Sequence, residues 1–153
     1  MLKWQRHFLK TLTDQSLRKS LRYTFTASST QSKYKYHNQN PQGVHLEDCV
    51  TRAISLATGL RYGAVSNLLD ISAGEYSCDK LCICCYHHLL EDILEYPRFD
   101  CDFTQTVKQI AASHPNNTLI IRVDLHLTAA VNGIVTDIWD CSDEWVDCFW
   151  VVA

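Results

Sequence analysis

The sequence contains a cysteine, a histidine and an aspartate whose types and spacing could support nucleophilic catalysis. Cys49 opens a segment with apolar residues at positions i, i+3, i+4 and i+7, which predicts a buried helix from Cys49 to Thr58. Asp48 suits the N-cap and Gly59 the position that ends the helix. A helix N-terminus favours the thiolate form of a cysteine, and its free N–H groups can bind an oxyanion. Cys49 is therefore a candidate nucleophile.

A predicted hairpin brings His126 and Asp137 together. Asn132-Gly133 is a strong signal for a two-residue turn, and in the resulting register the numbers of cross-strand partners add up to 265. Because side chains alternate along each strand, His126 and Asp137 project to the same face, whereas Asp140 points away unless a bulge intervenes. Asp137 could thus orient the imidazole as the third member of a catalytic triad, with Asp140 as the alternative.

Four sequence blocks carry a family resemblance. They are Asn38-Gln-Asn-Pro-Gln-Gly, Asp48-Cys-Val-Thr-Arg-Ala-Ile, His126-Leu-Thr-Ala-Ala-Val-Asn-Gly and Asp137-Ile-Trp-Asp-Cys-Ser-Asp. The order of a cysteine at a helix start, a histidine on a strand and an acidic residue on the next strand resembles the papain-like cysteine peptidases. The blocks are more closely similar to small, mostly uncharacterised papain-like proteins of bacteriophages and Gram-positive bacteria. The resemblance covers about residues 34 to 151.

The resemblance implies a compact papain-like α+β core that hydrolyses a peptide, isopeptide or other amide through a thioester acyl-enzyme. In this interpretation His126 moves the proton of Cys49, Asp137 fixes the imidazole, and Gln42 completes the oxyanion hole, with Gln39 as a weaker choice. No cofactor is required, and the substrate is a peptide or protein. The 77 positions from Cys49 to His126 fit only a reduced core, which favours a minimal amidase or processing peptidase.

One observation keeps another interpretation open. Glu47 and Asp48 directly precede Cys49 and would disfavour a thiolate unless they are paired or point away. The alternative function is a catalytically inactive papain-like binding module, such as a phage or effector protein that captures a host partner.

A dense group of thiols and imidazoles follows the second predicted helix. If this segment is helical, Cys78, Cys82 and Cys85 share one face and could bind a soft metal together with His88. The spacing matches no standard zinc pattern, so we prefer apolar filling of a helix face and expect no metal.

The remaining pattern predicts an α+β protein, with helices first and an antiparallel sheet afterwards. A short extended segment at 34–36 precedes the helix that starts at Cys49. Further helices are expected around 62–69, 81–96 and 103–111, and strands at 118–123, 125–131, 134–139 and 145–152.

Charge divides the 153-residue chain into a basic appendage with a linker (1–33) and a papain-like domain (34–153). Residues 1–40 hold eight basic residues and one acidic residue, whereas the remainder holds six basic and 16 acidic residues. The basic part could bind nucleic acid or another anionic partner, although a solvated or self-docked segment is the preferred interpretation. No apolar run spans a bilayer and no secretory signal is evident, so we expect reduced thiols and a cytoplasmic location, or the host cytoplasm for a phage protein.

Overall fold

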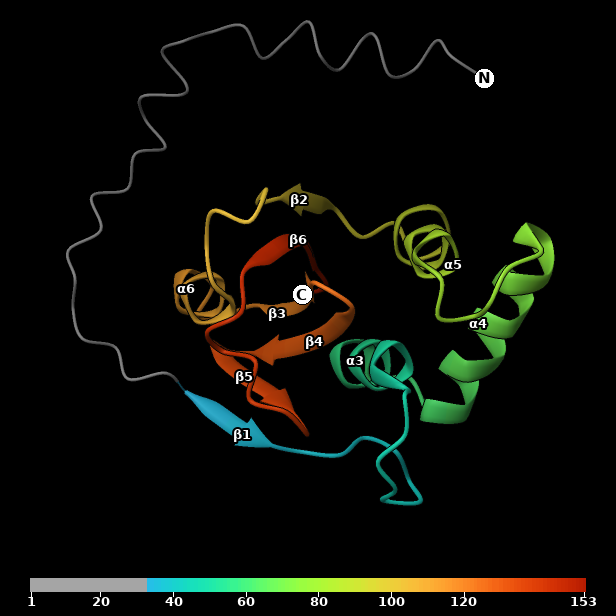
Figure 1. Ribbon diagram of the computed structural model, residues 1–153, viewed down its shortest axis with the longest axis horizontal. Helices are drawn as coiled ribbons and strands as arrows, with labels where there is room; N and C mark the ends of the chain where they lie inside the picture. The colour runs from blue at the N-terminus through green and yellow to red at the C-terminus, as the bar shows by residue number, and fades with distance from the viewer. Residues whose placement is uncertain (1–32) are drawn as a thin grey trace, which may run out of the picture. The chain divides into compact units, whose positions relative to one another are not determined.

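A six-stranded mixed sheet forms the centre of the fold in the computed structural model, which describes residues 33–153 (Figure 1). The strand order is β1-β5-β4-β3-β6-β2, and neighbouring strands are antiparallel except for β1, which is parallel to β5. The strands span Tyr34–Tyr36 (β1), Arg98–Asp100 (β2), Thr118–Val123 (β3), His126–Val131 (β4), Ile134–Asp137 (β5) and Val146–Val151 (β6). The predicted appendage at 1–33 falls almost wholly outside the described residues.

The helical elements within residues 33–153 all lie between β1 and β3 in the chain. They span Cys49–Thr58 (α3), Tyr62–Tyr76 (α4), Ile83–His87 (α5), His88–Ile93 (η1, a π-helix) and Val107–Ser113 (α6). Helix α3 ends where expected because Gly59, with φ of 72°, adopts the left-handed conformation that glycine tolerates without strain. No helix within 33–153 is long and apolar enough to cross a membrane.

Two hydrophobic clusters lie on opposite faces of the sheet. Ile54 of α3 packs in a cluster with Ile120, whereas Ile110 of α6 packs in a cluster with Leu119 and Ile121. Because successive residues of a strand point to opposite faces, α3 and α6 cover different sides of the sheet (Figure 1). This packing fixes the start of α3 against the sheet and so positions Cys49.

The α+β class and most strands agree with the sequence prediction, and the differences have local causes. The sheet is mixed because β1 pairs in parallel and β2 adds an edge strand that the pattern did not indicate. Phe103 lies outside the fourth helix, with φ of 55°, because Thr106 and Gln109 form a capping box that starts α6 at Val107. The helix predicted at 81–96 is divided into the short α5 and the π-helix η1.

Candidate active site

Cys49 is the first residue of α3 and is half-buried. The first N–H groups of an α-helix have no acceptor within the helix. Asp48 occupies the N-cap position, but its side chain forms no capping hydrogen bond. The first-turn N–H groups therefore remain available beside the thiol, where they favour negative charge.

The β4–β5 hairpin has the predicted register. Val131 pairs with Ile134, and Asn132 and Gly133 both have positive φ, at 51° and 75°, as a type I′ turn requires. At the opposite end of the hairpin, His126 Nε2 lies 2.7 Å from Asp137 Oδ2. The hairpin thus holds an imidazole against a buried carboxylate.

The carboxylate of Asp137 is fixed from several sides. Its Oδ1 atom accepts hydrogen bonds from Arg52 Nη1 at 2.9 Å and from the Ile138 N–H at 2.7 Å, which leaves Oδ2 for the imidazole. Strand β1 and the residue after it hold the main chain of the same residue, because the His37 N–H and the Tyr34 hydroxyl both donate to the Asp137 carbonyl oxygen, at 2.9 and 3.0 Å. The acceptor of the histidine therefore has little freedom to rotate.

Arg52 is a site residue that the sequence reading did not identify. It lies one turn after Cys49 in α3, is 5% exposed, and bridges two acids: Nε lies 2.6 Å from Asp48 Oδ1 while Nη1 contacts Asp137. A buried arginine is stable only when its charge is paired. The available signal was its spacing, since an arginine four residues after an aspartate in a helix can pair with it.

Asp48 directly precedes Cys49, but neighbouring side chains balance the negative charge of its carboxylate. Besides Arg52, the Tyr62 hydroxyl donates to Asp48 Oδ2 at 2.7 Å and Asn40 Nδ2 donates at 2.9 Å. Burial raises the pKa of this carboxyl, but the hydrogen bonds from Tyr62, Asn40 and Arg52 outweigh it, so the pKa is lowered. Its charge is thus balanced locally.

The electrostatics favour a thiolate–imidazolium pair. Burial disfavours the thiolate of Cys49, but hydrogen bonding with His126 and the Leu127 main chain, together with the charges of His126 and Arg52, lowers the thiol pKa. Burial likewise disfavours the imidazolium, yet hydrogen bonds with Asp137, Cys141 and Cys49 raise the pKa of His126 to about 11. Each group therefore stabilises the charged form of the other.

The pair opens into a groove of about 550 Å³. The start of α3, the β3–β4 turn and the segment that joins α4 to α5 contribute to its lining. Its apolar members include Leu46, Leu81, Ile83, Tyr86, Leu125 and Trp139. Leu125 is 95% exposed, and the Trp139 ring packs edge-on against His126 at 5.0 Å. An apolar side chain can thus be bound next to the thiol.

Other candidate residues lie apart from this pair. Gln42 is on an exposed turn and does not line the groove, while Gln39 bonds to His37 and donates to Ser55 Oγ at 3.2 Å. Asp140 is exposed, and its Oδ1 accepts a hydrogen bond from the Ser142 hydroxyl at 2.5 Å. The carboxylate that reaches His126 is that of Asp137.

Two groups within residues 33–153 place possible metal ligands together. Potential ligand atoms of His126, Asp137 and Cys141 lie within 4.8 Å of one another, but His126 Nε2 and Asp137 Oδ2 already bond to each other. The other group consists of Cys78, Cys82 and Cys84, and Cys85 Sγ lies 2.6 Å from Cys78 Sγ; these four residues are called the sulfur cluster below.

The predicted ligand His88 lies outside the sulfur cluster. Its Nδ1 atom is 2.8 Å from Asp92 Oδ2, and its Nε2 atom is 3.3 Å from Glu75 Oε2. Cys84, which the helical pattern did not include, contacts Cys78 and Cys82 instead.

Comparisons with protein families, with curated proteins and with solved structures give no match to this chain.

Proposed function

We propose that the chain is a cysteine-dependent hydrolase with a papain-like core, which cleaves a peptide, isopeptide or other amide bond through a thioester. The observation that carries this proposal is the 2.7 Å bond between His126 Nε2 and Asp137 Oδ2, next to a thiol whose pKa is lowered. A nucleophile, a proton carrier and a group that orients the carrier are the three parts that nucleophilic catalysis needs.

In the first half of the reaction, the Cys49 thiolate attacks the carbonyl carbon of the scissile bond. The carbonyl oxygen becomes an oxyanion, and the first-turn N–H groups of α3 stabilise it. The imidazolium of His126 donates its proton to the leaving amine as the tetrahedral intermediate collapses. The products are a free amine and a thioester on Cys49.

In the second half, water resolves the thioester. His126, now neutral, removes a proton from the attacking water, and the acid product leaves as the Cys49 thiolate and the imidazolium are restored. Asp137 stabilises the imidazolium and fixes its orientation throughout. Arg52 holds the second oxygen of Asp137 and so acts as a positioning residue.

The groove favours a substrate with an apolar side chain near the scissile bond. Leu46, Ile83 and Trp139 line the same groove as Cys49, and they are 56%, 46% and 45% exposed. Exposed apolar residues around a polar centre mark a binding surface, because their hydration is relieved when a ligand covers them.

The test is acylation of the chain by p-nitrophenyl acetate, followed by intact mass and peptide mapping. We expect a burst of nitrophenolate, one acetyl group on Cys49, and slow loss of that group to water. His126→Ala should reduce the acylation rate by about 10² to 10⁴-fold, the usual contribution of a positioned proton carrier.

A neighbouring aspartate supplies the matched control. Asp137→Asn should slow acylation, whereas Asp140→Asn should not, because Asp140 bonds to Ser142 and not to His126. Acylation spread over several cysteines, or equal rates for wild type and His126→Ala, would refute the hydrolase and favour the inactive binding module.

A further inference from the structure

The eight cysteines occupy two kinds of environment. Cys49 and Cys148 pack with the hydrophobic cluster beneath α3, and Cys101 and Cys141 belong to the cluster beneath α6. The members of the sulfur cluster belong to neither. Their sulfurs contact one another instead, at 2.6 to 3.9 Å. Cys85 is fully buried, but Cys78, Cys82 and Cys84 are only partly buried, so apolar filling does not account for these three.

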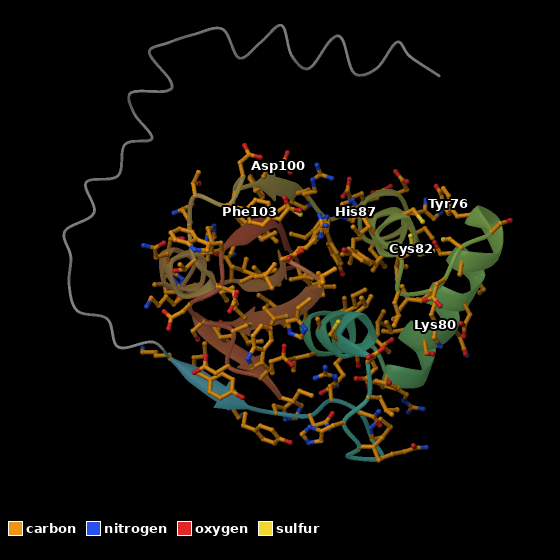
Figure 2. The ribbon with its side chains drawn as sticks, viewed as in Figure 1. Tyr76, Lys80, Cys82, His87, Asp100 and Phe103 are labelled. Carbon is orange, nitrogen blue, oxygen red and sulfur yellow. The ribbon has the colours of Figure 1, made fainter. Side chains whose placement is uncertain are left out.

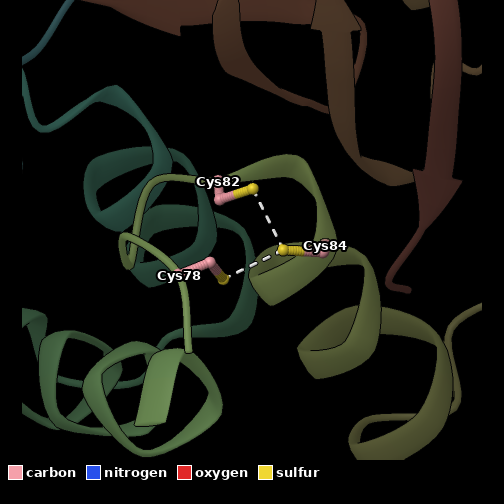
Figure 3. A group of neighbouring side chains, drawn as sticks. All are labelled: Cys78, Cys82 and Cys84. Atoms are coloured by element: carbon pink, nitrogen blue, oxygen red, sulfur yellow. Dashed lines mark hydrogen bonds between the residues drawn. The ribbon is translucent and has the colours of Figure 1, made fainter. Parts of the chain in front are cut away.

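The sulfur separations are those of a converging group. Cys78 Sγ lies 3.0 Å from Cys84 Sγ and 2.6 Å from Cys85 Sγ, and Cys82 Sγ lies 3.0 Å from Cys84 Sγ. Figure 3 shows Cys78, Cys82 and Cys84 pointing toward a common centre from a loop and the start of α5. The sulfurs of these three residues all lie within 4.8 Å of one another.

Turns in the segment between α4 and α5 bring these thiols together. Between α4 and α5 the chain makes tight turns: Ser77 has φ of 51°, Cys82 N–H donates to the Asp79 carbonyl at 2.9 Å, and Asp79 Oδ1 accepts from the Leu81 N–H at 2.8 Å. Cys82 and Lys80 can be located on this segment in Figure 2. Cys78, Cys82 and Cys84 are half-exposed, so an ion from solvent can reach them.

We propose that the sulfur cluster is a zinc site, in which the thiolates of Cys78, Cys82 and Cys84 bind Zn²⁺ and Cys85 provides the fourth sulfur. Zinc in structural sites takes four ligands at the corners of a tetrahedron, with Zn–S bonds of about 2.3 Å. That geometry separates the sulfurs by about 3.8 Å. The contacting pairs here lie 2.6 to 3.9 Å apart, so metal binding requires the closer pairs to move apart. Each ligand thiol releases its proton to solvent when the metal binds.

The zinc site would give the groove a rigid wall. Leu81, Ile83 and Tyr86 line the groove, and each is adjacent in sequence to at least one of the four sulfur ligands. A metal that fixes the ligands therefore also fixes these three side chains. The site is structural in this role and does not depend on whether Cys49 is catalytic.

The test is titration of the reduced, metal-free full chain with Co²⁺, followed by displacement with Zn²⁺. We expect one Co²⁺ per chain, with the intense thiolate-to-metal absorption and the tetrahedral visible bands, and loss of both when Zn²⁺ is added. Cys82→Ser and Cys84→Ser should each weaken binding at least about tenfold, the smaller effect known for changes around a metal site.

Controls separate this site from the other group of potential ligands. Cys141→Ala and Cys49→Ala should bind Co²⁺ as the wild type does, and Cys49→Ala also makes the result independent of the proposed hydrolysis. In wild-type protein, zinc should slow alkylation of Cys78, Cys82 and Cys84, a readout that needs no variant to fold. Absence of the thiolate absorption, binding that Cys82→Ser and Cys84→Ser leave unchanged, or unprotected cluster thiols would each overturn the proposal.

Discussion

Cys49 lies among charged groups, whereas Cys78, Cys82, Cys84 and Cys85 lie among one another. His126 and Arg52 stabilise negative charge on Cys49, and Asp137 holds His126 in place. In the sulfur cluster each sulfur contacts at least one other sulfur, at 2.6 to 3.9 Å, and Cys85 Sγ also donates to the Asp79 carbonyl oxygen. Cysteine side chains therefore lie in two different chemical environments. An imidazole determines the environment of Cys49, and other thiols determine the environment of the sulfur cluster.

This difference shows that the environment of a cysteine depends on the residues that contact it in the folded chain. The residues next to it in the sequence do not determine that environment. Cys49 follows two acids in the chain, which argues against a thiolate, yet the folded structure pairs Asp48 with Arg52. The sulfur cluster has the spacing of a helix face in sequence, yet its first members lie on a turn.

The prediction with the largest expected effect tests whether the reactivity of Cys49 is independent of the sulfur cluster. At about pH 6, iodoacetamide should label Cys49 at least about tenfold faster than any other cysteine, because thiolate is the reacting species. His126→Ala should remove this advantage. Cys82→Ser should leave it intact, because iodoacetamide is too small to need the groove wall. Peptide mapping after brief labelling measures these rates, and a slow Cys49 in Cys82→Ser would show that the regions are coupled.

The next prediction concerns the buried arginine that joins Asp48 to Asp137. Arg52→Met should lower the free energy of unfolding by about 3 to 5 kcal/mol, because it leaves buried carboxylates without their partner. Urea denaturation measures the change.

Arg98 provides the comparison for Arg52. It pairs with Glu91 and Asp100 at the surface, so Arg98→Met should cost at most about 1 kcal/mol. Similar losses in the two variants would mean that the buried network contributes no special stability.

A pH series tests the charge on His126. Its pKa is raised from 6.5 to about 11 in the folded chain, so the stabilisation from the charged ring is complete below 6.5 and is lost as the pH rises toward 11. The stability advantage of wild type over His126→Gln should therefore shrink between about pH 7 and pH 9, by at most about 1.4 kcal/mol per pH unit. An advantage that stays constant over this range would mean that the ring is already neutral in the fold, because neither state would then lose a proton between pH 7 and pH 9.

The prediction with the smallest expected effect concerns the backbone conformation of the β4–β5 turn and involves no charged group. Gly133→Ala should destabilise the chain by about 1 to 2 kcal/mol, because φ is 75° there and a new Cβ would lie 3.3 Å from the Ala111 carbonyl oxygen. Gly63→Ala, in α4 with open space around it, should instead stabilise by about 0.5 to 1 kcal/mol. Thermal unfolding of both variants gives the comparison, and a neutral Gly133→Ala would mean that the hairpin turn is not constrained.

Local patterns were enough to predict the elements that carry the site. Helix α3 and strand β3 have the predicted bounds, since each has a strong apolar period and a clear end. The Asn-Gly turn set the hairpin register, and register places His126 near Asp137. These are short-range properties, which the order of residues determines directly.

Contacts between distant segments could not be predicted in the same way. Arg52 and Asp137 are 85 positions apart, and their pairing depends on how α3 packs against the sheet. In the same way, Cys84 replaces His88 in the sulfur cluster because the chain turns between α4 and α5, where a continuous helix had been assumed. The resemblance to papain-like proteins supplied roles for residues, and those roles await the acylation test.

The parallel pairing of β1 with β5 has a practical consequence for the design of shortened versions of the chain. The Lys33 carbonyl accepts a hydrogen bond from the Val135 N–H, and the Tyr34 hydroxyl and the His37 N–H both donate to Asp137. A truncation that removed Lys33 to His37 would therefore remove the hydrogen bonds that hold Asp137, the last residue of β5. This would happen although the removed residues are far from Cys49 in the sequence. An expression boundary that preserves the site has to lie before Lys33.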